Sequence, residues 1–590
     1  MNMIAIPDRL RSGLTTTASG AVDQQEKLQQ ALGGSEELPE DWEATAKVVR
    51  ETGKNVLGVS SGQRKEDKES WWWNEEVQES IQKKKAAKKK WDNQRDEGSR
   101  QEYCEAGRIA KIMVTKAKAQ AYDELYERLD SKEGVKDLYR LAKRWVGGLF
   151  NKLLESERMP DEWRSSELVP IFKNKGDVQS CSNYRGIKLI SHTMKVWERV
   201  VEARLRREVQ ISEQQFGFMP RKSTTDAIFA LRVLVEKYRE GQKELHCVFV
   251  DLEKADDRVP RQELWYCMRK SGVAEKYVRV VQDMYEDSET VVRCAVGVTN
   301  GFKVKVGLHQ GSALSPFLFA MVMDRLTDEV RQEAPWTMMF ADDIVICGES
   351  REQVEENLER WRFALERRGM KVSRDETEYM CVNEREAGGK VKMQGVEVVK
   401  VDDFKYLGST IQSNGQCRKE VKKRVQAGWS GWRRVSGLMC DRRIAARVKG
   451  KVYKTAVRPA MMFGLETVAL SKRQEAELEV AEMKMLRFSL GVTRLDKIRN
   501  EQIRGTVKVE QFGDKAREAR LRWFGHVLRR NSGYIGQRML EMELPGRRRR
   551  GRPQRRFMDV VKVDMEMVGV KVEEAVDRAR WRQMIRCGDP

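Results

Sequence analysis

The segment WTMMFADDIVIC, residues 336–347, places two adjacent acidic residues between two apolar runs. Short continuous apolar runs are typical of buried strands, so the runs on either side of Ala341, Asp342 and Asp343 predict a tight β-hairpin with acids at its tip. An Asp-Asp pair in a turn often reflects turn chemistry alone. Adjacent carboxylates repel each other, however, and this pair is easier to explain if a cation neutralises it.

A third acidic residue follows another apolar run. Asp251 comes directly after HCVFV, residues 246–250, which predicts a carboxylate at the carboxyl end of a buried strand. The simpler alternative is an ordinary Asp at a strand end. Carboxylates from separate strands, without His or Cys companions, favour hard cations such as Mg²⁺. Two such ions can clamp the attacking and leaving oxygens of a phosphoryl displacement.

The charge balance points to a phosphate-bearing partner. The 590 residues include 112 Lys plus Arg and 91 Asp plus Glu, a formal net charge of +21. This excess suits nucleic acid or an acidic membrane surface, and together with the carboxylates it favours polymerase or nuclease chemistry. Four scattered His residues disfavour histidine-based hydrolysis. Apolar runs are too short for a transmembrane helix or signal peptide, and ten Cys without a C-x-x-C pair predict neither a disulfide framework nor a zinc knuckle.

The composition changes several times along the chain. Residues 1–70 lack a sustained period and are expected to be mostly disordered. Residues 71–144 contain IQKKKAAKKKW, which predicts a Lys-rich helical arm, and the alternative to a nucleic-acid contact there is a solvated charged helix. Residues 145–410 predict a mixed α/β domain. Its expected elements include a buried strand at 168–172 and capped helices at 223–241 and 350–369.

Seven segments then occur in one order: LVPIFKNKGD…SNYRGIKLI (168–190), EQQFGFMPRKSTTDAI (213–228), VFVDLEKADDRVP (248–260), GLHQGSALSPFLF (307–319), FADD (340–343), GMKVSRDETEYM (369–380) and FKYLGS (404–409). With them, the chain resembles the reverse transcriptase of non-LTR, LINE-type retrotransposons, most like the RTE group, over about 145–470.

The resemblance implies an α+β fold, a right-hand polymerase with fingers, palm and thumb. A helical N-terminal arm would precede it and a basic, mainly helical C-terminal region would follow. In these terms the regions are a remnant of an endonuclease junction (1–70), the Lys-rich arm (71–144), fingers and palm (145–410), a thumb-like helical region (411–470) and a basic helical region with an Arg-rich tail (471–590).

The resemblance also implies an activity and its partners. The activity is RNA-directed DNA polymerisation with two Mg²⁺ ions, for which Mn²⁺ is an alternative. The implied partners are an RNA template, a DNA primer and deoxynucleoside triphosphates, with no membrane. The implied location is intracellular, in the nucleus, the cytoplasm or both.

Site roles follow position by position from the resemblance. Asp251, Asp342 and Asp343 match the metal-binding acids, with Asp251 and Asp342 as the stronger ligands. The remaining matches are Lys173 and Arg185, which would grip the incoming triphosphate, and Gln310, Gly311 and Ser312, which would lie beside the nascent base pair. FKYLGS resembles a primer-grip hairpin.

Four departures from the family pattern support an alternative function. Asp256 stands where the family has Phe or Tyr, and Glu376 stands where it usually has Lys. The segment between the Lys-rich arm and Trp163 is short for an upstream fingers region, and no endonuclease fits in the first 70 residues. The alternative is a catalytically decayed, nucleic-acid-binding relic that keeps only the fold.

The tail PGRRRRGRPQRR, residues 545–556, is rich in Arg, and its Pro and Gly residues oppose a helix or strand. Arg550 and Arg552 belong to an Arg-Gly-Arg-Pro segment that resembles an AT-hook, in which Arg enters a narrow A/T minor groove. A nuclear-import signal and non-specific phosphate binding are the alternatives.

Overall fold

The computed structural model describes residues 74–94, 96–129, 147–173, 176–294, 297–385, 388–546, 551 and 554–588. Two compact units make up the chain, Met1–Glu162 and Trp163–Pro590. The disorder predicted for residues 1–70 and the predicted groove contacts of Arg550 and Arg552 lie outside the described residues. None of the helices in the described ranges has the length and apolar character that crossing a membrane requires.

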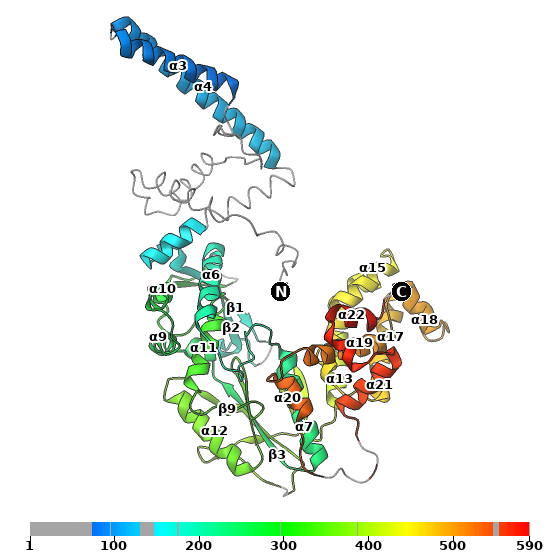
Figure 1. Ribbon diagram of the computed structural model, residues 1–590. Coiled ribbons are helices and arrows are strands. Elements are labelled where there is room, and N and C mark those ends of the chain that lie inside the picture. The colour runs from blue at the N-terminus through cyan, green and yellow to red at the C-terminus, as the bar shows by residue number, and fades with distance from the viewer. Residues whose placement is uncertain are drawn as a thin grey trace. The chain divides into compact units, whose positions relative to one another are not determined.

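The Lys-rich segment of the first unit is helical, and it turns back on itself instead of forming one arm. α3 (Glu75–Gln94) and α4 (Glu97–Leu129) lie side by side (Figure 1). Asp96 explains the break, because its carboxylate accepts a hydrogen bond of 2.7 Å from a backbone N–H in the first turn of α4. Trp91 stacks on Tyr103 with ring centroids 5.5 Å apart, which joins the two helices.

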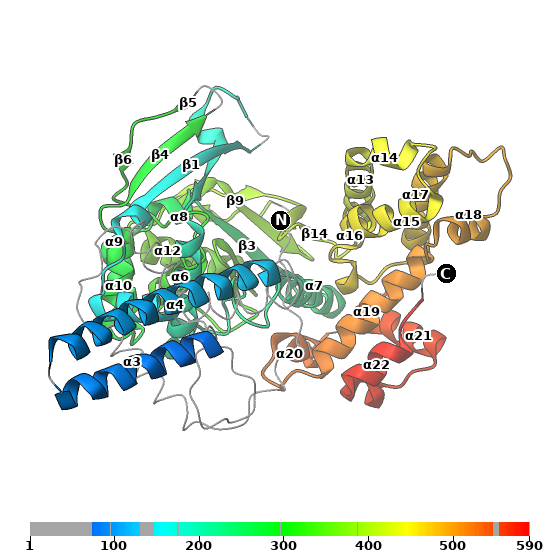
Figure 2. The same ribbon diagram turned by 90° about the horizontal axis from the view of Figure 1, so that it is seen from above.

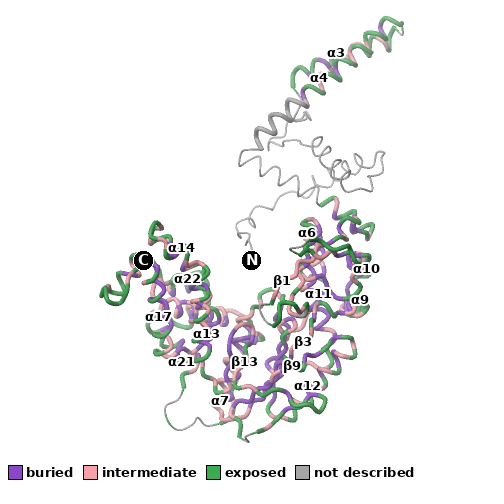
Figure 3. The backbone as a smooth tube through the Cα atoms, turned by 180° about the vertical axis from the view of Figure 1, so that it is seen from behind, coloured by how far each residue is buried: buried purple, intermediate pink, exposed green. Residues whose placement is uncertain are grey.

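A five-stranded sheet forms the centre of the second unit, in the order β12-β9-β3-β8-β7. β3 is antiparallel to both of its neighbours, and β7 and β8 form the predicted hairpin. Figure 3 shows that buried residues run along β3 and β9. The strands are β3 (Leu245–Leu252), β7 (Thr337–Phe340), β8 (Asp343–Gly348), β9 (Val372–Val382) and β12 (Val399–Lys400).

Helices cover both faces of this sheet, so the fold is α+β as predicted. α7 (Thr224–Gly241) and α12 (Arg351–Glu366) lie on opposite faces (Figure 1). Both begin where the sequence predicts, with a capping box at the start of α7 and Ser350 as the N-cap of α12. Further helices of the same region are α6 (His192–Glu208), α8 (Ala255–Arg258), α9 (Arg261–Lys270), α10 (Glu275–Tyr285) and α11 (Ser315–Leu326).

A second sheet projects beyond the first, as Figure 2 shows for β1 and β4. The segment LVPIF is a strand, but the prediction that it is buried is wrong, because Ser166 is the only buried residue of β1. Most side chains of β1, β2 and β4 are partly or fully exposed. Its strands are β1 (Ser165–Phe172), β2 (Tyr184–Leu189), β4 (Glu289–Cys294), β5 (Gly297–Val298) and β6 (Phe302–Lys303).

FKYLGS forms a hairpin of β13 (Asp403–Tyr406) and β14 (Ser409–Gln412), and the chain beyond it is helical. One apolar core holds the first six of these helices together. The helices of this region are α13 (Arg418–Arg434), α14 (Ser436–Cys440), α15 (Ala446–Val452), α16 (Arg458–Met462), α17 (Lys472–Leu490), α18 (Asn500–Val507), α19 (Phe512–Leu528), α20 (Ile535–Glu541), α21 (Phe557–Val568) and α22 (Arg578–Met584).

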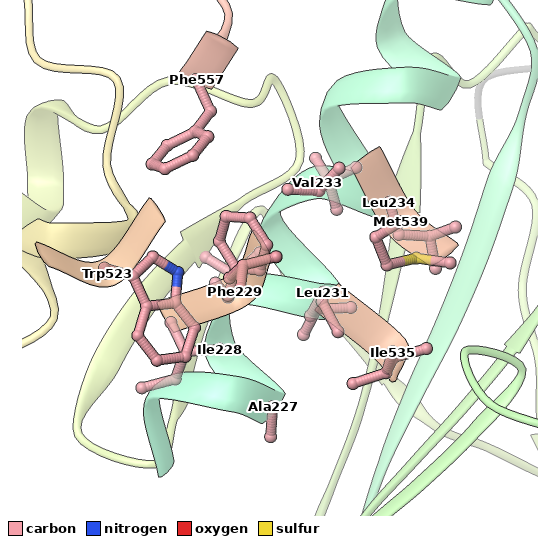
Figure 4. Close-up of a cluster of buried hydrophobic side chains, with 14 of the residues drawn as sticks. Ala227, Ile228, Phe229, Leu231, Val233, Leu234, Trp523, Ile535, Met539 and Phe557 are labelled. Atoms are coloured by element: carbon pink, nitrogen blue, oxygen red, sulfur yellow. The ribbon is translucent and has the colours of Figure 1, made fainter. Parts of the chain in front are cut away.

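The last four helices contribute to the same apolar core as α7 and the central sheet. Figure 4 shows Trp523 and Phe557 beside Phe229 of α7. The ring centroid of Phe229 lies 5.6 Å from that of Trp523 and 5.0 Å from that of Phe557, both in edge-to-face geometry. The C-terminal region therefore shares its largest apolar core with the strands that carry the predicted acids.

Candidate active site

Strand register brings the predicted acids to one end of the central sheet. Val250 of β3 pairs with Ile344 of β8, so the next residue along β3, Asp251, comes beside Asp343 at the start of β8. Asp342 lies in the turn between β7 and β8. Residues on neighbouring strands hold their Cβ atoms about 5 Å apart, so the carboxyl groups meet at this edge. Asp251 is also the only residue of β3 that is not fully buried.

The acids change one another's ionisation. Burial raises the pKa of Asp251 to about 7, and the hydrogen bond and charge of Glu376, followed by the charges of Asp342 and Asp343, act in the same direction. Asp343 keeps an exposed face, yet desolvation of its carboxyl group, with the charge of Asp342, raises its pKa to about 6. Like charges are therefore concentrated at this end of the sheet.

The departure at Glu376 adds a fourth carboxyl group to this site. Asp251 pairs with Ser373 across β3 and β9, and the backbone N–H of Glu376 donates to the Ser373 hydroxyl. The Glu376 side chain shares a hydrogen bond with Asp251. This contact and the charge of Glu376 both raise the pKa of Asp251.

The oxygen-only donor set has the chemistry that Mg²⁺ prefers. Within the described ranges, no group of three or more His, Cys, Asp or Glu side chains is already gathered as a metal site. A divalent cation would offset the burial and the neighbouring like charges that raise the pKa values of Asp251 and Asp343.

Asp256, the second departure, lies within the same site. It belongs to the short helix α8, and its backbone carbonyl accepts a hydrogen bond of 2.7 Å from the Leu308 N–H. Burial and the charge of Asp342 raise the pKa of Asp256, whereas a hydrogen bond from Gln310 and the charge of Arg185 lower it. Asp256 thus connects the acids to two of the residues predicted to bind nucleotide.

The two predicted triphosphate-binding cations share an acidic neighbour. Burial raises the pKa of Asp257, while the nearby charges of Lys254, Lys173 and Arg185 lower it. Arg185 lies on β2 opposite Ile171 of β1, and Lys173 directly follows β1. Strand pairing therefore holds both cations against the helix that follows Asp251.

The loop at Gln310 and Gly311 packs closely on β2. The Lys188 backbone N–H donates to the Gln310 carbonyl at 2.8 Å. Gly311 has φ of +102°, and a Cβ atom there would lie 2.6 Å from the Lys188 carbonyl oxygen. Only glycine combines this conformation with so close an approach, which fixes the loop beside β2, the strand that carries Arg185.

Two buried residues position the site without having been singled out from the sequence: Glu198 lies outside the seven segments, and Gln215 lies in the second segment, EQQFGFMPRKSTTDAI. The Glu198 carboxylate of α6 accepts hydrogen bonds from the Ser312 hydroxyl at 2.6 Å and from the Ala313 N–H at 2.7 Å. Gln215 Oε1 accepts a hydrogen bond of 3.1 Å from the Ala341 N–H at the hairpin tip. Glu198 interrupts the apolar stripe of its helix, and that interruption is the one sequence signal that could have revealed it.

Comparisons with known proteins identify similar sequences. Residues 172–411 match the family described as reverse transcriptase (RNA-dependent DNA polymerase). The chain is 24% identical to the probable RNA-directed DNA polymerase from transposon BS of Drosophila melanogaster, over 54% of this chain and 37% of that protein. It is 22% identical to the RNA-directed DNA polymerase from mobile element jockey of Drosophila melanogaster, over 69% of this chain and 45% of that protein.

A third relative is a retrotransposon polyprotein. The chain is 22% identical to the retrovirus-related Pol polyprotein from type-1 retrotransposable element R2 of Nasonia vitripennis, over 47% of this chain and 29% of that protein. This chain therefore spans less than half the length of each of these three relatives.

Proposed function

We propose that this chain, whose residues 172–411 form a reverse transcriptase domain of the LINE type, copies an RNA template into DNA. It would extend a DNA primer with deoxynucleoside triphosphates, inside the cell, in the nucleus, the cytoplasm or both. The observation that carries the proposal is the strand register that brings Asp251 to the Asp342–Asp343 hairpin tip. Carboxylates at one open sheet edge suit metal-assisted phosphoryl transfer.

We assign the sheet containing β1, β2 and β4 as fingers and the five-stranded sheet as palm. The helices from α13 to α16 would form the thumb, and the β13–β14 hairpin would hold the primer end. This assignment puts Lys173 and Arg185 in the fingers and the acids in the palm. The charges of Lys173 and Arg185 reach Asp257, six residues after Asp251, which supports a nucleotide site between the two sheets.

Asp251 and Asp342 would hold two Mg²⁺ ions, with Asp343 beside them, and Mn²⁺ would suit the same oxygen donors. Bound metal supplies positive charge to the phosphoryl oxygens and orients the attacking and leaving oxygens. The repulsion that raises the pKa of Asp251 supports this role, because a bound cation would relieve it.

Side chains of the protein would bind and position the incoming nucleotide. Lys173 and Arg185 would bind the triphosphate of the incoming nucleotide, since charge builds on its oxygens during transfer. Asp257 would hold the two cations in place until the more highly charged triphosphate replaces it. Gln310 and Gly311 would set the position of the new base pair, because their loop is fixed against β2.

The second candidate function is nucleic-acid binding without catalysis. Asp256 favours it, because a carboxylate beside Asp342 adds negative charge where a triphosphate would bind. The shared hydrogen bond between Asp251 and Glu376 also favours it, because a protonated carboxyl group is a poor metal ligand.

One experiment distinguishes the two functions. The purified full chain is incubated with an RNA template, an annealed DNA primer, deoxynucleoside triphosphates and Mg²⁺, and extension is followed on a sequencing gel. Binding of the same template–primer is measured by fluorescence anisotropy. The polymerase proposal expects both binding and extension. Binding without extension, in Mg²⁺ and also in Mn²⁺, would contradict it and support the relic.

A further inference from the structure

A second charged site lies away from the acids, on the outer face of α7. A cavity of about 810 Å³ opens where α7, the loop after β14, the starts of α13 and α17 and the segment before α21 meet. Seven Arg or Lys residues and two Glu residues line it. None of the predicted active-site residues is among its lining residues, so the cavity is a separate feature of this unit.

Two arginines of α7 form the floor of this cavity, which we call the basic pocket. Arg232 donates from Nη2 to the Ser409 hydroxyl at 2.9 Å, and Arg239 donates from Nη1 to the Gln554 side-chain oxygen at 2.7 Å. These acceptors are neutral. Arg232 Nε and Arg239 Nη2 are buried, and neither has a hydrogen-bond partner among the described residues, although Arg239 Nη2 forms a longer ion pair of 3.8 Å with Glu240 Oε1. Unsatisfied buried donors of this kind indicate a missing acceptor.

The rim of the basic pocket adds five exposed cations that no acid neutralises. Within the part of the chain that the structure describes, their side chains form no ion pair and no hydrogen bond; they are Arg418, Lys422, Lys472, Arg473 and Arg555. They come from three separate segments, so the clustering is produced by the fold and not by a run of basic sequence.

The position of two rim residues goes against helix stability. Lys472 and Arg473 occupy the first two positions of α17, directly after its N-cap Ser471. The helix dipole is positive at this end, and it disfavours cations by a few tenths of a kcal/mol up to about 1 kcal/mol each. A local departure of this kind, without a compensating acid partner, is expected at a functional site. The dipole also adds to the positive potential inside the pocket.

The two lining acids do little to offset this charge. Glu236 uses its carboxylate to accept a hydrogen bond of 2.8 Å from the Phe557 backbone N–H. Burial raises the pKa of Glu236 to about 7, so near neutral pH it carries only part of a negative charge. Glu477 is exposed to solvent, which screens its charge.

We propose that the basic pocket binds phosphate groups, through the guanidinium groups of Arg232 and Arg239 on its floor and the cations of its rim. Guanidinium and ammonium groups together are the usual recognition set for phosphate. The volume is in the range of sites that hold a small molecule or a few nucleotides of a strand. The phosphates could belong to a nucleic-acid strand or to a free polyphosphate. This site goes beyond the proposed polymerase activity and does not depend on it.

The first test maps contact at the pocket itself. Surface lysines of the full chain are acetylated with and without ligand, and mass spectrometry compares Lys422 and Lys472 with Lys484, an exposed lysine of α17 outside the lining. The probes are a ten-nucleotide single-stranded RNA and inorganic tripolyphosphate. Selective protection of Lys422 and Lys472 by either probe supports the proposal, and protection by the RNA alone identifies a strand as the source of the phosphates.

The second test uses matched variants. Lys472→Gln with Arg473→Gln removes two rim charges, and Lys484→Gln with Arg494→Gln removes two exposed charges elsewhere. For the protecting probe, we expect the first variant to bind about fivefold or more weakly and the control to bind as the parent does. With RNA, the slope of log affinity against log salt should fall by about 1.4, or about 0.7 for each lost phosphate contact.

Two results would overturn the proposal. One is protection of Lys422 and Lys472 no greater than that of Lys484 with both probes. The other is equal weakening in the two variants, which would indicate only a general effect of charge. Neither readout uses primer extension, so a catalytically inactive chain would still test the pocket, and failure of the pocket would leave the polymerase proposal unaffected.

Discussion

The acidic end of the central sheet and the basic pocket both gather like charges, but they expose them to water differently. At the acidic end, burial together with neighbouring carboxyl groups raises the pKa of Asp251 to about 7. At the basic pocket, five cations stand at the rim in solvent, and only two arginines lie on the floor. Solvent screens exposed charges, so the rim costs little when no ligand is present.

The two regions differ in what their charged side chains require when no ligand is bound. Half-buried carboxylates are driven to take up a proton or a cation, and burial, followed by the influence of Glu376, raises the pKa of Asp251 in that direction. Exposed cations are screened by solvent and require no partner when no anion is bound. The acidic end is therefore suited to chemistry that depends on a metal, whereas the basic pocket is suited to binding alone.

The largest expected effect is the loss of primer extension when an acid of the central sheet is replaced. Asp342→Asn removes one charge and one metal ligand at the hairpin tip, and we expect primer extension to fall by about 100-fold or more. The rate is measured with RNA template and saturating Mg²⁺. Asp402→Asn, the same change at an exposed residue outside the site, is the control and should extend primers at the parent rate. Equal losses in the two variants would mean that Asp342 has no special role.

A smaller effect, in the opposite direction, concerns Asp256. Its carboxylate lies near Asp342, where a triphosphate would bind, so removing it should favour the nucleotide. We expect Asp256→Tyr to raise the extension rate about tenfold at low nucleotide concentration, through loss of repulsion and gain of a stacking surface. Asp256→Asn removes the charge without adding the ring and should give part of this gain. An unchanged rate in both variants, in a chain that extends primers, would show that Asp256 is harmless.

Much of the local structure could be predicted from the sequence. The β7–β8 hairpin, the strand before Asp251 and the helices α7 and α12 appear as expected. Each depends on signals within a few residues, namely apolar runs, N-caps and terminal glycines. The acids could be located for the same reason, because a carboxylate directly after a buried strand has only one end of the sheet to occupy.

The partners of these residues could not be predicted, because they come from distant segments. Glu376 reaches Asp251 only through the pairing of β3 with β9, whose register shifts between Phe249 and Asp251. Glu198 holds a loop that is 114 residues away. The basic pocket joins residues from Arg232 to Arg555, and no local period connects them. Contacts of this kind depend on tertiary packing, which periodicity does not encode.

The smallest expected effect concerns the stability contribution of Glu236, a partly buried acid that lines the basic pocket. Glu236 is surrounded by cations, yet its pKa is raised to about 7, because burial outweighs the lowering by the Phe557 N–H and by Arg239. The folded chain therefore binds this proton more tightly than the unfolded chain, where the pKa is near 4.5. The free energy of unfolding consequently falls as pH rises from about 4.5 to about 7, and it stays lower above that.

Glu236→Gln keeps an oxygen acceptor for the Phe557 N–H but cannot ionise. We expect this variant to be more stable than the parent by roughly 1–3 kcal/mol at pH 8 and to lose that advantage near pH 4.5. Urea denaturation at a series of pH values measures the difference. Glu477→Gln, the same change at the exposed rim, should leave the pH dependence as it is in the parent. If both variants were stabilised equally at pH 8, burial of Glu236 would not be the cause of its raised pKa. The basic pocket would then contain no acid whose ionisation is controlled by burial, as that of Asp251 is.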